Sequence, residues 1–178
     1  MGNLSIVVGI VAGSCGTAFY FALSVVTDFR MKYPWLIYFL PIGGLAIVGL
    51  YHLCKDDNDT GTNLVISAIH SGDKVPFIMA PLIFVSTLIT HLFGGSAGRE
   101  GAALQMGGSI GSSIGRVFRF DEKDKHVMIM CGMSAAFSAL FGTPMAAAIF
   151  SMEMISVGVM YYIALVPCVI SSLIAHGI

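Results

Sequence analysis

The chain has 178 residues, of which 56% are hydrophobic and 11% are charged, and its mean hydropathy is +0.86. An ordinary soluble domain carries about 25% charged residues, so this composition excludes that class and predicts an integral membrane protein. The formal net charge of -1 argues against nucleic acid as a partner, because such a partner needs a basic patch on the protein.

Two apolar segments open the chain, at residues 4–26 and 35–53. Each has close to the ~20 residues with which a helix crosses a bilayer. No basic region precedes the first segment and no small-residue cleavage site follows it, so we predict a retained helix and not a signal peptide. The most polar stretch of the chain, residues 55–60, comes next, followed by an apolar piece at 61–70 that is too short to cross.

Residues 75–93 form a third segment long enough to cross. Pro76 stands at its start and Pro81 within its first turns, where a missing N–H group costs little. The charged stretch 119–126 is expected outside the hydrocarbon. Shorter apolar segments, several of them unable to span upright, occupy residues 102–118, 126–141, 144–157 and 158–176.

Short helices interrupted by glycine are informative in so apolar a chain. Irregular backbone at membrane depth is tolerated only where it is buried in protein or lines a water-filled cavity. Transporters also use discontinuous helices whose N-terminal ends face an anionic substrate. We therefore predict an all-α fold, a polytopic membrane protein with broken and tilted helices, in a single membrane domain over residues 1–178.

An Arg99-Glu100 pair stands between glycines in the middle of this apolar sequence. An ionisable residue at bilayer depth faces protein or a watery path, which makes it a transport-site hypothesis. Gly98 and Gly101 allow the backbone to approach a ligand closely. They also leave N–H groups open at the start of the following helix, where an anion is stabilised.

Three motifs in order carry a resemblance to a known family. Residues 98–101 read Gly-Arg-Glu-Gly, residues 105–111 read Gln-Met-Gly-Gly-Ser-Ile-Gly, and residues 141–153 read Phe-Gly-Thr-Pro-Met-Ala-Ala-Ala-Ile-Phe-Ser-Met-Glu. Together they resemble the CLC family of chloride channels and proton-coupled anion antiporters. The resemblance covers nearly the whole chain and corresponds to the N-terminal half of a usual family member.

The resemblance implies a gating role for Glu100, whose carboxylate would occupy an anion site when deprotonated and leave it when protonated or displaced. It implies that Gly98, Arg99, Gly101 and Ala102 belong to the loop and helix start that present N–H donors to the anion. Family members usually carry proline at the position of Ala102, so the chain departs from the pattern there.

The first anion-binding loop departs further from the family pattern. Family members carry Gly-Ser-Gly-Ile-Pro where this chain has Asp59-Thr60-Gly61-Thr62-Asn63. The hydroxyl groups of Thr60 and Thr62 and the amide of Asn63 can still donate to an anion. The variant loop and the missing proline resemble the fluoride-exporting branch, so the resemblance leaves chloride and fluoride both open as the small anion.

Later positions bear on proton coupling. By the same resemblance, Pro144 matches a second helix start and Glu153 a carboxylate near the cytoplasmic end of that helix. In proton-coupled antiporters a second glutamate often follows directly, but here that residue is Met154. A proton relay through that carboxylate is therefore not expected, although protons remain candidate partners of Glu100.

The family's remaining anion ligands, a Gly-x-Phe-x-Pro loop and a tyrosine, come from its C-terminal half, and this chain has neither. We expect it to be a fragment of a longer protein or to obtain them from a partner. Family members pair as dimers through late helices of each half, so residues 158–176 are expected to form a homodimer interface or an ordinary lipid-facing span.

The sequence thus predicts anion transport, with fluoride export and a non-transporting half-length subunit as alternatives. No second catalytic group accompanies Glu100 and no cluster has metal-ligand spacing, so we expect no enzyme activity, cofactor or metal. A multi-pass position in the plasma (inner) membrane is expected, with the lipid bilayer as a partner.

Overall fold

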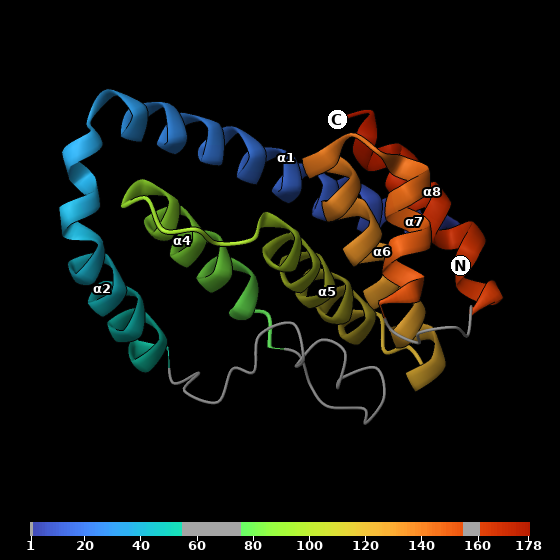
Figure 1. Cartoon of the computed structure of the whole chain (residues 1–178). Helices are drawn as coiled ribbons and strands as arrows, with labels where there is room; N and C mark the ends of the chain where they lie inside the picture. Colours follow the sequence, from blue (N-terminus) through green and yellow to red (C-terminus); the bar gives the residue numbers. More distant parts are fainter. Residues whose placement is uncertain (1, 55–75, 155–160) are drawn as a thin grey trace.

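The computed structural model describes residues 2–54, 76–154 and 161–178, and every regular element in these ranges is a helix. Helix α2 stands at one end of the molecule, α6, α7 and α8 gather at the other end, and α4 and α5 lie between them (Figure 1). Helix α1 runs along the whole assembly and joins the two ends. The predicted all-α architecture with short, differently inclined helices is confirmed.

Helix α1, Gly2–Lys32, is longer than predicted, because the sequence from Thr27 to Lys32 continues the helix without a proline or glycine. A 3₁₀ helix, η1 at Pro34–Phe39, leads into α2 at Leu40–Leu53. By length and composition, Leu4–Lys32 and Pro34–Leu53 are both able to cross a membrane, as predicted.

The third predicted span is shorter than expected. Helix α4 is Met79–Leu92, and its 14 residues extend about 21 Å, against a hydrocarbon core of about 30 Å. Pro76 does not begin the helix; its carbonyl oxygen instead accepts a turn hydrogen bond from the Met79 N–H at 3.2 Å. Pro81 lies in the first turn of α4, as predicted.

The next two helices begin earlier than predicted, and both shifts concern charged residues. Helix α5, Arg99–Val117, takes in the Arg99-Glu100 pair at its start. Helix α6, Glu122–Phe141, begins within the charged stretch, with Asp121 in the position that precedes the first turn. Acidic residues are favourable in a first turn because the positive end of the helix dipole lies there.

Two short helices and a 3₁₀ turn complete the described chain. Helix α7, Pro144–Glu153, follows α6 across a turn in which Gly142 has φ +68° and donates to the Ser138 carbonyl oxygen at 2.8 Å. The 3₁₀ helix η2, Tyr162–Ala164, precedes α8, Leu165–His176. Apart from residues 155–160, which lie outside the described ranges, the predicted segments at 144–157 and 158–176 thus contain shorter helices than expected.

Helix α6 is the centre of the packing. It contacts α1, α5, α7 and α8, and its residues from Val127 to Ala136 are all buried. The backbones of α5 and α6 touch, since a Cβ on Gly107 would collide with the Gly132 carbonyl oxygen and one on Gly111 with that of Met128. The glycines of α5 therefore serve the small-residue helix contact predicted from the sequence.

Buried hydroxyl groups join α6 to α8. Ser134 donates to the Cys168 carbonyl oxygen at 2.9 Å, Ser138 to that of Ser172 at 2.8 Å, and Ser171 to that of Cys131 at 3.1 Å. Cys131 and Cys168 both lie at this crossing as free, buried cysteines, as predicted for free cysteine.

Candidate functional site

Glu100 is the second residue of α5, and its side chain is exposed at the start of that helix. Arg99 beside it is exposed as well, while Gly101 is half-buried and Ala102 is buried at 8% exposure. The structure thus brings four predicted residues, Arg99 to Ala102, into one helical turn whose outer face carries both charges.

Gly98 precedes the first turn of α5 with extended backbone, φ -68° and ψ 130°, and no side chain caps the helix there. The first N–H groups of a helix have no partner within it and favour a negative charge. A Cβ at Gly98 would meet no atom within 4 Å, so the space beside this helix start is open. The arrangement can hold a small anion or a carboxylate.

The segment between α4 and α5 is shaped by two further glycines. Gly94 has φ +82°, and the Gly95 N–H donates to the Thr90 carbonyl oxygen at 2.8 Å. The guanidinium of Arg30, at the far end of α1, lies directly against Gly94. Sequence reasoning missed Arg30, because nothing in the local pattern around residue 30 indicates a contact with residue 94.

The second helix start implied by the resemblance is also present. Helix α7 begins at Pro144, preceded by Thr143, whose side chain makes no capping hydrogen bond. Glu153 is the last residue of α7, so it lies at the other end of that helix from Pro144. The structure therefore confirms that Pro144 begins a helix and that Glu153 ends it.

The first predicted anion-binding loop, with Thr60, Gly61, Thr62 and Asn63, lies outside the described residues. Its part in an anion site therefore stays a prediction.

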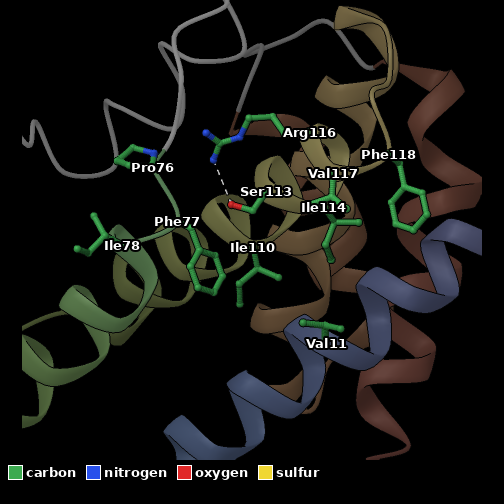
Figure 2. A pocket seen from close by; sticks show the side chains of 10 residues that line it. All are labelled: Val11, Pro76, Phe77, Ile78, Ile110, Ser113, Ile114, Arg116, Val117 and Phe118. Atoms are coloured by element: carbon green, nitrogen blue, oxygen red, sulfur yellow. Dashed lines mark hydrogen bonds between the residues drawn. The ribbon is translucent and has the colours of Figure 1, made fainter.

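A cavity of about 830 Å³ lies at the opposite end of α5 from Glu100. Figure 2 shows α1, the beginning of α4 and the last turns of α5 around it, with the Arg116 guanidinium donating to the Ser113 hydroxyl oxygen at 3.2 Å. Its wall is mostly hydrocarbon, so it does not extend the site at Glu100. The lining residues are Val11, Pro76, Phe77, Ile78, Ile110, Ser113, Ile114, Arg116, Val117 and Phe118.

Proteins of known kind are similar to this chain over almost all of its length. A chloride/fluoride channel protein of Pseudomonas syringae pv. tomato is 42% identical over 96% of this chain and 38% of its own length. An H(+)/Cl(-) exchange transporter of Vibrio cholerae is 28% identical over 98% of this chain and 41% of its own length. The chain therefore spans less than half the length of these relatives.

Solved structures show the same partial coverage. The crystal structure of a CLC-type fluoride/proton antiporter matches 99% of this chain and 45% of its own chain, with a TM-score of 0.92 and 39% identity. A slow cyanobacterial Cl-/H+ antiporter matches 98% of this chain and 45% of its own chain, with a TM-score of 0.76 and 25% identity. The helices described above thus form nearly half of that fold.

One family model covers most of the chain. The model described as voltage gated chloride channel matches residues 43–178, which include the Glu100 helix start and all of α4 to α8. This chain belongs to the voltage gated chloride channel family.

Proposed function

We propose that this chain forms part of a protein that transports a small anion across a membrane, with Glu100 as its gate. The observation that carries the proposal is the place of Glu100, an exposed carboxylate in the first turn of α5 beside an uncapped helix start. A helix N-terminus stabilises a negative charge by about 0.3–1 kcal/mol at an exposed site. So small an energy allows a permeant anion to exchange with the carboxylate reversibly.

Fluoride is the anion best supported, with protons as the coupled ion. The relative from Pseudomonas syringae is named a chloride/fluoride channel protein, and the structural neighbour at 39% identity is a CLC-type fluoride/proton antiporter. The chloride exchanger of Vibrio cholerae is less similar, at 28% identity. Protonation of Glu100 would neutralise the carboxylate and free the helix start for the anion, which links proton and anion movement.

The chain spans less than half of its relatives, so the remaining walls of the path come from elsewhere. We place them in a continuation of the chain, a partner polypeptide or a second copy, within a bacterial-type plasma membrane. A half-length subunit that only assembles with another protein is the alternative, and it predicts no flux that depends on Glu100.

Anion flux from proteoliposomes tests the proposal. The chain is reconstituted alone and together with the part of the Pseudomonas relative that it does not cover, and fluoride and chloride efflux are followed with ion-selective electrodes over a range of pH. We expect fluoride efflux to exceed chloride efflux in at least one arrangement. Absence of efflux in both arrangements would overturn anion transport, and chloride in excess of fluoride would overturn the choice of anion.

Glu100→Gln tests the gate, because glutamine keeps the size of the side chain but cannot titrate. We expect efflux from this variant to lose its pH dependence. Glu122→Gln is the matched control, since Glu122 is an exposed carboxylate in the first turn of another helix, paired with Lys125 at 2.7 Å. An unchanged pH response in Glu100→Gln would overturn the gating role.

A further inference from the structure

Five exposed aromatic rings surround the corner where α1 ends and η1 begins. They form two contacting pairs: Phe29 with Tyr33, ring centroids 4.9 Å apart, and Trp35 with Phe39, ring centroids 5.7 Å apart. The fifth ring, Tyr38, is the most exposed at 83%, and Trp35 is 54% exposed. We call Phe29, Tyr33, Trp35, Tyr38 and Phe39 the aromatic corner.

The corner lies between two helices that can each cross a membrane. Leu4–Lys32 ends and Pro34–Leu53 begins on either side of Tyr33. Together η1 and α2 extend about 33 Å, which matches a hydrocarbon core of about 30 Å. When two consecutive segments both cross, the turn that joins them lies where hydrocarbon meets water.

The side chains of the aromatic corner suit the boundary between hydrocarbon and water. Tyrosine and tryptophan have an apolar body and a polar tip, and they gather at the level of the lipid headgroups. Lys32, exposed in the last turn of α1, adds positive charge beside the rings. Its charge complements the phosphate groups of phospholipids, and long basic side chains reach such groups from helix ends.

We propose that the aromatic corner binds the headgroup layer of the bilayer, with its rings at the level of the glycerol and phosphate groups. The contact of Arg30 with Gly94 gives this surface a further consequence. Because Gly94 leads into α5, the corner holds the Glu100 end of that helix toward the same side of the membrane. This inference needs only that the chain is in a membrane, so it is independent of the transported ion.

Trp35 permits a direct test, because it is the only tryptophan of the chain. The full chain is reconstituted in vesicles of phosphatidylcholine and phosphatidylglycerol that contain a lipid with a nitroxide on the headgroup or, separately, near the end of an acyl chain. We expect the headgroup nitroxide to quench Trp35 fluorescence about twofold more strongly than the deep one, as for aromatic residues at the interface.

Two other results would overturn the proposal. Stronger quenching by the deep nitroxide would place the corner within the hydrocarbon. Weak quenching by both lipids would show that protein, either a second copy or another part of the family fold, covers the rings. Because each lipid reports a depth, no separate measurement of activity is needed.

A matched variant calibrates the depth scale. In the double variant Trp35→Phe, Leu45→Trp, the single tryptophan moves to the middle of the span formed by η1 and α2, at a side chain that is 73% exposed. We expect the order of quenching to reverse, with the deep nitroxide the stronger by about twofold. If both tryptophans respond identically to the two lipids, the corner has no preferred depth and the proposal fails.

Discussion

Arg30 and Gly94 meet although 64 positions separate them in the sequence: a Cβ built on Gly94 would lie 2.8 Å from Nε of Arg30 and 3.2 Å from its Cζ. Gly94 also has φ +82°, a conformation that side chains with a Cβ rarely adopt. The backbone conformation therefore requires glycine at this position, and the flexible end of the Arg30 side chain packs against it. The contact joins the end of α1 to the turn from which α5 begins.

Gly94→Ala should destabilise the fold by about 1–2 kcal/mol, the usual cost of a left-handed conformation for a residue with a Cβ. The Arg30 guanidinium can shift to admit the new Cβ, because it is the end of a flexible side chain, so the cost comes from the backbone conformation. Gly98→Ala is the control, since Gly98 has φ -68° and open space beside it. Unfolding in detergent with increasing denaturant, followed by circular dichroism, measures both variants. Equal stability of the two variants would contradict the strain at Gly94.

The helix start at residues 98–101 and the contact of Arg30 with Gly94 show what could and could not be predicted from the sequence. The glycine-bracketed charges at 98–101 indicated a helix start with an anion-binding character, because local sequence sets the positions of helix ends. The contact of Arg30 with Gly94 was not predictable, since it depends on how α1 lies across α4 and α5. The hydrogen bond from the Ser171 hydroxyl to the Cys131 carbonyl oxygen was missed for the same reason, although the burial of Cys131 followed from its apolar surroundings.

Helix lengths show a similar division between local and tertiary causes. The two N-terminal spans were predicted nearly correctly, because a long apolar run without interruption has few alternatives. Residues 75–93 were wrongly expected to form one spanning helix. The turn at Pro76 delays the helix to Met79, and Leu92 ends it before Gly94. A hydropathy pattern counts these turn residues as part of the span.

The glycine contact between α5 and α6 yields a second prediction. Gly132→Ala should destabilise the fold by about 1–3 kcal/mol, the typical cost of overpacking, because its Cβ would collide with the Gly107 backbone. Gly44→Ala is the matched control on α2, where a Cβ meets no atom within 4 Å. In that helix alanine should be neutral or stabilise by up to about 1 kcal/mol. The free energies of unfolding of both variants check this, and a tolerated Gly132→Ala would rule out the close approach of the backbones.

The serine hydrogen bonds between α6 and α8 yield a third prediction. Ser138→Ala removes a buried hydroxyl that donates to the Ser172 carbonyl oxygen, and we expect a loss of about 0.6–2 kcal/mol, as for hydrogen bonds between membrane helices. Ser14→Ala removes an exposed hydroxyl that bonds only within its own helix, to the Ile10 carbonyl oxygen at 2.7 Å. Its effect on the free energy of unfolding should stay within about 0.5 kcal/mol. A similar loss of unfolding free energy in both variants would mean that the hydrogen bond between α6 and α8 adds nothing to the stability of the fold.

Glu100→Gln yields the last prediction, which separates a gating defect from a folding defect. Glu100 is exposed in the first turn of α5, so its charge contributes only the helix-dipole energy of about 0.3–1 kcal/mol. The variant should therefore unfold at nearly the same denaturant concentration as the unsubstituted chain, while the pH dependence of anion efflux disappears. If efflux and stability fall together, by more than about 2 kcal/mol of unfolding free energy, the carboxylate supports the fold. In that case the loss of efflux says nothing in favour of a gate.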